Sequence, residues 1–146
     1  MANNKDNVST GKPKVGGAVF TAAAGSTLPT DATTALDEAF KSLGYCSEDG
    51  VTNSSGISTE NIKAWGGDIV DTPQTEKTDT FKVKLIECTN TDVLKTVYNS
   101  SNVSGDLDTG LTIKVNSAEH EDQAFVFDMI LKNNVLKRVV VPFGKV

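Results

Sequence analysis

A long polar passage from Ser47 to Asp79 constrains this chain more than any other feature, because it holds few apolar residues for its length. It is rich in Ser, Thr, Asn, Gly and Asp, and yet it holds the only tryptophan of the chain, Trp65. A loop of this length is uncommon in a compact domain and is usually functional or disordered. An exposed aromatic side chain in such a loop either pins the loop to its own core or awaits a partner. The residues alone leave both interpretations open.

Composition narrows the class of protein. The chain has 146 residues, which suffices for one domain with a core that needs no disulfide or metal. Only 38% of the residues are apolar, which indicates that part of the chain lies outside the core of the monomer. The net charge is −5 and Arg138 is the only arginine, so the clustered basic patch of a nucleic-acid-binding protein is missing. Such a chain would repel DNA rather than grip it.

The N-terminal residues 1–17 contain Gly, Pro, Lys and Asn and little to bury, which predicts a flexible arm. They lack the apolar core of a secretory signal, and the sequence contains no apolar run of about 18 residues that would predict a transmembrane helix. We therefore expect no membrane partner. Cys46 and Cys88 fit a reducing compartment and are expected to be free thiols, although spacing alone leaves a bridge open.

Hydrophobic alternation dominates the rest of the chain and predicts β-structure. Strands are expected over residues 18–22, 40–48, 80–88, 111–117, 124–131 and 135–141. The strand 80–88 is half-buried, and 124–131 is apolar enough to be buried on both faces. Asn133–Asn134 suits a tight hairpin turn, and Pro142 is expected to end the return strand.

Helical signals are few. A helix is predicted over 91–99, capped by Asn90 or Thr91, with the pairs Val93–Val97 and Leu94–Tyr98 on one face. It is too short to be stable alone and must pack on a sheet. A shorter helical turn is expected to begin near Asp31 or Thr33.

The sum of these elements is a mainly β domain over 18–146, built as a β-sandwich or barrel of two packed sheets flanked by one short α-helix.

The sequence gives little indication of an enzyme. His120 is the only histidine, and it lies between Glu119 and Glu121, on an expected exposed turn. A metal site there, or a small metal-dependent enzyme using His120, is an alternative to a solvated turn. The segment DLDTG, which begins at Asp106, lacks the glutamate that closes a calcium loop. We expect no catalytic, cofactor or metal site.

Three segments together are similar to a known family. They are GYCSEDGVT, the KAWGG turn and TPQTEKTDTFK, and they occur in this order within a likeness that runs from about Gly16 to the C-terminus. The sequence resembles the major tail proteins, or tail tube proteins, of long-tailed bacteriophages that infect Gram-positive bacteria. Relatives of this kind usually continue beyond the position of Val146, so this chain is expected to be either a short or a trimmed member.

The resemblance implies a structural protein rather than an enzyme. Its fold would be a β-sandwich or barrel flanked by one α-helix, like the inner tube protein of type VI secretion. Subunits would form hexameric rings that stack into a hollow tube, through which DNA passes during ejection without specific binding. Partners would be other copies of the chain and the tape measure, tail tip and tail terminator proteins. The tube would belong to the virion and be assembled in the cytoplasm of the host bacterium.

The resemblance also assigns roles to surfaces. The N-terminal arm and the 47–79 loop would contact neighbouring subunits and rings, with Trp65 anchoring the loop in a pocket of an adjacent subunit. Acidic side chains would line the lumen. The residues assigned in this way are Lys12, Pro13 and Lys14 in the arm, Ile62, Trp65, Gly66, Gly67, Asp68 and Ile69 in the loop, and Asp37, Glu38 and Glu87 as lumen candidates.

Two alternatives remain beside the tube subunit. One is a β-sandwich binding module that recognises a host surface or a virion partner through the 47–79 loop. The other is the enzyme that would depend on His120. The first predicts a monomer with one partner site, and the second predicts loss of activity when His120 is replaced.

Overall fold

The computed structural model describes residues 2–146, and the chain divides into two compact units. One unit consists of the chain up to Cys46 together with the chain from Leu85 onward, and the other of Ser47–Lys84. Several antiparallel sheets and one α-helix make the protein mainly β, which confirms the predicted fold class and is consistent with a β-sandwich.

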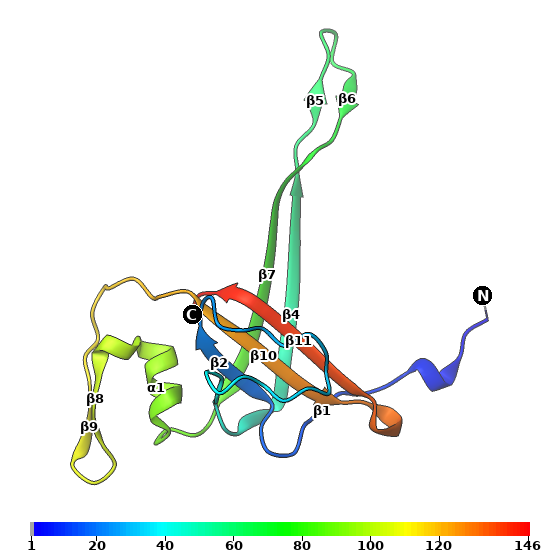
Figure 1. Ribbon diagram of the computed structural model, residues 1–146. Coiled ribbons are helices and arrows are strands. Elements are labelled where there is room, and N and C mark those ends of the chain that lie inside the picture. Colours follow the sequence, from blue (N-terminus) through cyan, green and yellow to red (C-terminus); the bar gives the residue numbers. More distant parts are fainter. Residues whose placement is uncertain (1) are drawn as a thin grey trace. The chain divides into compact units, whose positions relative to one another are not determined.

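The larger unit is built on a five-stranded antiparallel sheet with β10 at its centre (Figure 1). On one side β10 pairs with β11, and on the other side with β2 and β1, while β3 pairs with β2. These strands are β1 (Lys12–Pro13), β2 (Val19–Ala23), β3 (Lys41–Ser42), β10 (Gln123–Ile130) and β11 (Leu136–Gly144).

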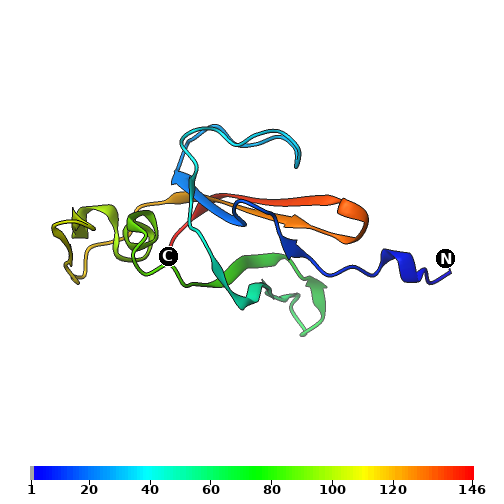
Figure 2. The ribbon, with the colours of Figure 1, turned by 90° about the horizontal axis from the view of Figure 1, so that it is seen from below.

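The central strand β10 is buried on both faces, as its apolar sequence predicts, and Ala124 and Val126 are fully buried. On one face they pack with Ala22 and with Phe40, which comes from the loop after β2. Figure 2 shows this loop running across one face of the sheet. The core of this unit is therefore a sheet face closed by an irregular segment rather than by a helix.

The hairpin between β10 and β11 turns at the predicted position. Asn133 and Asn134 both have positive φ, at 60° and 59°, within the short 3-10 helix η3 (Lys132–Asn134). Asparagine tolerates this left-handed region better than other residues with a side chain. Unlike the prediction, β11 continues through Pro142 to Gly144, because a strand at the sheet edge tolerates a residue without an N–H.

This turn carries a testable prediction. Replacing Asn133 with valine should destabilise the protein by about 1–2 kcal/mol, because a β-branched side chain is strained at positive φ. Asn133→Gly should leave stability within about 0.5 kcal/mol of the native chain, since glycine adopts this conformation freely. Urea unfolding followed by circular dichroism measures both variants, and equal midpoints for the two would contradict the assignment.

The predicted helical turn near Asp31 is wrong. The Asp31 carboxylate accepts hydrogen bonds from the backbone N–H groups of Thr33 and Thr34 at 2.8 and 2.6 Å, as a helix cap would. However, the carbonyl oxygens of Asp31 and Thr34 accept hydrogen bonds from Arg138 rather than from a following helical turn. The segment then runs irregularly, so that Leu36 and Phe40 reach the core.

The prediction of one continuous strand over 40–48 is also wrong. Only Lys41–Ser42 forms β3, and the next strand begins at Cys46. Phe40 and Leu43 are both buried, which is incompatible with strict alternation. The break occurs at Gly44, whose φ of +69° and close approach to the Glu87 carboxyl exclude any side chain.

The helix α1 (Thr91–Tyr98) forms as predicted. The Asn90 side chain caps it by accepting a hydrogen bond from the N–H of Asp92 at 3.0 Å. Val93 and Leu94 are buried, whereas Val97 and Tyr98 remain 39% exposed, so the predicted i,i+4 pairs are buried only at their first members.

A short 3-10 helix, η2 (Ser100–Asn102), and a hairpin of β8 (Val103–Asp106) and β9 (Gly110–Ile113) follow the helix. The predicted strand 111–117 therefore ends at Ile113. The side chains of Asn102 and Asn116 then donate hydrogen bonds to each other at 3.1 and 2.9 Å, which fixes the segment after β9 without a strand.

The smaller unit overturns the prediction that 47–79 is a loop. It is a long hairpin of β4 (Cys46–Thr59) and β7 (Gln74–Leu85), which carries a short hairpin of β5 (Ile62–Lys63) and β6 (Ile69–Asp71) at its end (Figure 1). These strands are rich in Thr and Ser and mostly exposed. Before residue 80 they therefore show no regular alternation of apolar and polar residues that would predict a strand. The half-buried pattern predicted from residue 80 onward is confirmed as far as Leu85.

Candidate functional site

The tip of the smaller unit carries the strongest exposed apolar signal. Trp65 lies in the turn between β5 and β6 and is fully exposed, at 106% of its reference area. The turn is closed by hydrogen bonds from the N–H of Ala64 to the carbonyl of Asp68 (2.7 Å) and from the N–H of Gly67 to the carbonyl of Ala64 (3.0 Å). The hairpin thus holds the indole outside any core.

Further apolar side chains surround this turn in sequence and are also exposed. They are Ile57, Ile62, Ile69 and Val70. Exposed apolar clusters on a soluble domain mark contact surfaces for proteins or membranes. We call the segment Ile62–Ile69, with Trp65 at its centre, the tip; it holds all six residues that the sequence assigned to the loop contact.

The N-terminal arm lies on the other unit. Lys12 and Pro13 form β1 and pair with Ile130 and Met129 of β10. The arm begins with the 3-10 helix η1 (Lys5–Asn7), and most of its side chains are exposed. The arm therefore has a place on the sheet in the single chain, and the three arm residues predicted to make contacts lie together there.

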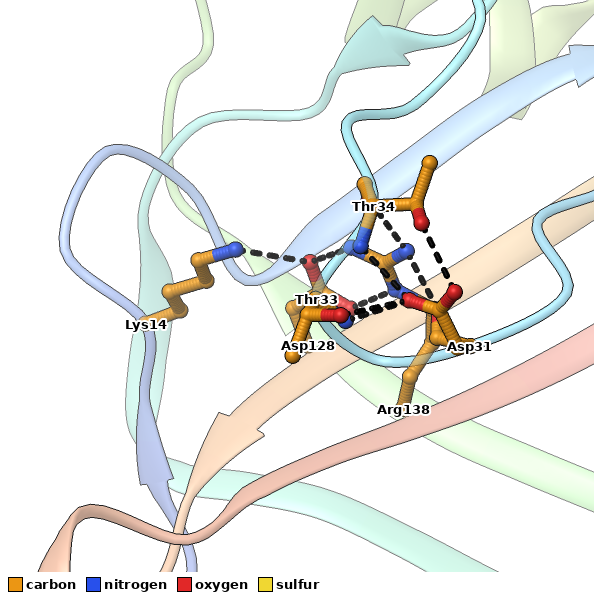
Figure 3. A network of polar contacts seen from close by, with 6 residues as sticks. All are labelled: Lys14, Asp31, Thr33, Thr34, Asp128 and Arg138. Carbon is orange, nitrogen blue, oxygen red and sulfur yellow. Dashed lines mark hydrogen bonds and ion pairs between the residues drawn. The ribbon is translucent and has the colours of Figure 1, made fainter.

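A buried ion pair stands beside the arm (Figure 3). Arg138 on β11 donates from Nε and Nη2 to the two carboxylate oxygens of Asp128 on β10, at 2.6 and 2.8 Å. Only 4% of the Arg138 side chain and 5% of the Asp128 side chain are exposed. The Nζ of Lys14 lies 3.7 Å from the same carboxylate. A charged pair this deeply buried must be well hydrogen-bonded to be tolerated.

The remaining guanidinium nitrogen of Arg138 holds the loop after β2. Its Nη1 donates to the carbonyl oxygens of Asp31 and Thr34, at 2.8 and 2.9 Å. Hydrogen bonds from Thr34 and Thr33 hold the pKa of the Asp31 carboxyl well below its usual range. Hydrogen bonds to Asp128 raise the pKa of Arg138, which stays charged. The network joins the arm, two strands and the loop that closes the core.

The sequence analysis missed this network, although a signal for it was present. Asp128 is the only charged residue in an otherwise buried strand, and Arg138 is the only arginine. A hairpin centred on Asn133 places these two residues directly opposite each other, as the register Asp128↔Arg138 shows. Combining the turn with the strand pattern would have predicted the pair.

The three lumen candidates lie on different segments. Asp37 and Glu38 are exposed in the loop after β2, and the Asp37 carboxylate accepts from the N–H of Ala39 at 2.9 Å. Glu87 precedes α1, and its carboxylate accepts from the Tyr45 N–H at 2.9 Å and from Asn90 Nδ2 at 3.0 Å. Which of them faces a lumen stays a prediction, but Glu87 has a clear structural role.

Glu87 gives a pH-dependent prediction. The hydrogen bonds from Asn90 and from the Tyr45 backbone lower the pKa of its carboxyl. A lowered folded-state pKa adds stability above the unfolded value of about 4.5, and this stability is lost as pH falls through the folded value. Glu87→Gln should therefore flatten the loss of stability below about pH 4.5, measured as urea midpoints between pH 3 and 6. Glu38→Gln, in an exposed loop, is the matched control, and an unchanged acid limb in Glu87→Gln would contradict the assignment.

A metal site at His120 was an alternative left open by the sequence. Among residues 2–146, no group of three or more His, Cys, Asp or Glu side chains could hold a metal ion. His120 is half-buried rather than exposed, with its Nδ1 buried and lacking a hydrogen-bond partner. The DLDTG segment is a turn in which Asp106 Oδ1 accepts from the N–H groups of Asp108 and Thr109.

The two cysteines are free thiols, with Cys46 half-buried and Cys88 exposed. Burial, assisted by the charge of Glu87, raises the pKa of the Cys46 thiol, which makes it a weak nucleophile. No helix within the described part of the chain is long and apolar enough to cross a membrane.

These features define a mainly β protein with a fully exposed tryptophan at a hairpin tip and a buried ion pair within its main sheet. The sequence matches the phage tail tube protein family over residues 1–146, and the chain therefore belongs to that family. It is a structural component of the phage tail, built to associate with itself and with other tail proteins. No curated protein matches the chain. No solved structure matches it either.

Proposed function

We propose that this chain forms hexameric rings that stack into the hollow tail tube of a phage of a Gram-positive host, through which DNA is ejected. The observation that carries the proposal is the fully exposed Trp65 at the end of a hairpin unit, within a family of tail tube proteins. A side chain of this size is costly to leave in water and is the commonest kind of interface anchor.

Two further surfaces support contacts between copies. The strand β11 pairs with β10 along one side, and within residues 2–146 no strand pairs along its other side. A nine-residue edge strand is a template for pairing with another chain, so ring closure uses the sheet edge at Leu136–Gly144. The arm residues Lys12–Lys14 provide the other contact, in line with the role that the family resemblance implies.

Charge supports the passage of DNA. The net charge of −5 gives each ring of six a strongly negative field, which keeps DNA from adhering to the wall. Asp37, Glu38 and Glu87 are the side chains proposed to face the lumen. Charge reversal to lysine tests Asp37 and Glu38 and should slow ejection without preventing assembly. Glu87 is unsuitable for this test, because its carboxylate also accepts the hydrogen bond from the Tyr45 N–H.

Assembly takes place in the cytoplasm of the host bacterium and ends with the tube in the virion. The tail tip protein nucleates the first ring, the tape measure protein occupies the lumen during growth, and the terminator protein closes the last ring.

A binding module that recognises a host surface or virion partner through the same hairpin is the competing function, because an exposed tryptophan also suits a paratope. The binding module and the tube subunit differ in whether copies of the chain associate with one another. A module stays a monomer of 15.5 kDa at all concentrations, whereas a tube subunit forms rings of six.

Analytical ultracentrifugation separates these functions. Across a concentration series, the tube subunit should shift from the monomer to a species of six subunits and then to larger stacks. Limited proteolysis of the same samples should cut residues 47–84 in the monomer and spare them in the larger species. A single monomeric species throughout, with the hairpin protected only when a host extract is added, would contradict the proposal.

A further inference from the structure

The strands β1 and β2 are two parts of one interrupted strand. Because β11 occupies one side of β10, both β1 and β2 lie along the other side. Pro13 pairs with Met129 and Val19 pairs with Phe127, so the whole segment between Pro13 and Val19 lies opposite Asp128 alone. The chain loops out at this point, between two parts that follow the same partner strand.

The loop has the features of a hinge. The N–H of Lys14 donates to the Asp128 carbonyl at 3.4 Å, and the Asp128 N–H donates to the carbonyl of Ala18 at 2.7 Å, so β10 holds both ends. Between them, Gly16 has a φ of +94° with open space around it. The Val15 side chain is 92% exposed. The bend is closed by a hydrogen bond from the Gly17 N–H to the Lys14 carbonyl at 3.3 Å, and Gly17 lies close to Phe20 and Ser42 of the sheet. Val15 and Gly16 make no such contact, and the glycine at the centre allows the bend to straighten.

Beyond the hinge the arm pairs with β10 at Lys12 and Pro13, and its remaining contacts are exposed and polar. Ser9 Oγ accepts a hydrogen bond from the Lys132 N–H at 2.8 Å, and Lys132 Nζ lies 3.2 Å from Asp6. Lys14, whose ammonium faces Asp128, is 36% exposed. Ion pairs exposed to water contribute little, because solvent screens them and ordering the side chains costs entropy. Leaving its place costs the arm mainly its pairing with β10, and the same pairing is regained when the arm enters the identical site of another copy.

When the arm leaves, the site that it vacates on β10 can bind another segment of the same kind. Asp128 keeps its two short hydrogen bonds to Arg138, so removing Lys14 does not strand a buried charge. The edge of β10 at Met129 and Ile130, the Asp128 carboxylate and the Lys132 N–H then lie open. We call this the arm site; it fits a segment with the spacing of Asp6 to Lys14 of this chain.

We propose that in the assembled tube residues 6–14 of one copy occupy the arm site of a neighbouring copy, by straightening of the Val15–Gly17 hinge. This inference rests on the proposed function and adds the molecular contact by which the arm joins subunits. Each copy donates one arm and accepts one, so the contact is heterologous and extends along the tube as rings stack. In the free subunit the arm occupies its own site and shields it from premature exchange.

Disulfide trapping tests the exchange directly. Lys12 and Ile130 are cross-strand partners, and partners of this kind have Cα atoms about 4.5–5.5 Å apart, within disulfide range. In a parent with Cys46→Ala and Cys88→Ala, we make Lys12→Cys in one chain and Ile130→Cys in another. The two single-cysteine chains are mixed, oxidised under mild conditions and run on a non-reducing gel. Lys95→Cys, on the exposed side of α1, replaces Lys12→Cys in the control mixture.

If arms exchange between copies, assembled material should give a heterodimer band. This band should be at least tenfold stronger than the band from dilute, unassembled subunits, and at least tenfold stronger than the band from the control mixture. A chain with both Lys12→Cys and Ile130→Cys should close within itself when dilute and link copies into a ladder when assembled. A contrary result would be tubes in which the double variant forms disulfides only within each chain, together with no heterodimer from the mixed chains. That result would overturn arm exchange but would not contradict the tube function. Absence of tubes from native and parent chains alike would overturn the tube function, and the exchange with it.

Discussion

Replacing Arg138 with methionine is expected to destabilise the protein by about 3–5 kcal/mol, because it leaves the Asp128 carboxylate buried without its partner. Asp128 is 5% exposed and has one other cation nearby, Lys14, at 3.7 Å. That ammonium is 36% exposed and cannot replace the two short hydrogen bonds of the guanidinium. The variant also loses both hydrogen bonds to the carbonyls of Asp31 and Thr34. Urea denaturation at neutral pH measures the loss.

A double-mutant cycle identifies the cause. Asp128→Leu combined with Arg138→Met removes both charges, and apolar replacement of a buried pair is often close to neutral. The double variant should therefore recover at least half of the stability lost in Arg138→Met. Arg138→Lys, which keeps the charge but not the planar fork, should fall between native and Arg138→Met. A loss below about 1 kcal/mol in Arg138→Met would show that the pair does not hold the loop and sheet together.

Replacing Trp65 with alanine should impair tube growth, by raising the concentration needed for assembly, while leaving the subunit folded. The indole is fully exposed in the single chain, so its removal should change the free energy of unfolding by less than about 0.5 kcal/mol. An aromatic anchor at an interface is commonly worth 2 kcal/mol or more, which corresponds to about a 30-fold rise in the concentration needed for assembly. Pelleting assays over a concentration series measure that threshold.

Two variants accompany this experiment. Trp65→Phe keeps an aromatic side chain and should raise the threshold only modestly. Val115→Ala removes an exposed apolar side chain in the other unit, 83% exposed, and should leave the threshold unchanged. Unfolding of Trp65→Ala, or tubes with an unchanged threshold, would contradict the interface role of the tip.

The sequence predicted the elements that have a hydrophobic period or a turn signal of their own. The strand β10, the Asn133–Asn134 turn, the Asn90 cap of α1 and the half-buried pattern up to Leu85 are of this kind. Each follows from residues near one another in the chain. The long hairpin was missed because its strands are mostly exposed and alternate only at the end of β7, from Phe81 to Leu85.

The irregular segments were mispredicted because distant groups decide their conformation. The Asp31 region looks like a helix start, but Arg138 binds the carbonyls that a helix would use. The strand expected from Phe40 breaks at Gly44, where Glu87 approaches the backbone. In both places, tertiary contacts outweigh the secondary structure that the local sequence favours.

For the candidate site, the sequence pointed to the segment around Trp65, and its role in assembly stays a prediction. Trp65 stood out because a large apolar side chain in a polar passage needs a partner. The hairpin that presents it follows from pairing between segments far apart in sequence, which composition does not reveal. The place of the arm on β10 likewise depends on a register that only the fold provides.

Negative-stain electron microscopy of the purified protein, at low and high concentration, tests the central claim most directly. We expect hollow tubes or stacked rings at high concentration, or after addition of isolated tail tips, and image averages with six-fold symmetry. Single small particles at every concentration, unchanged by tail tips, would contradict the proposal that this chain builds a tube.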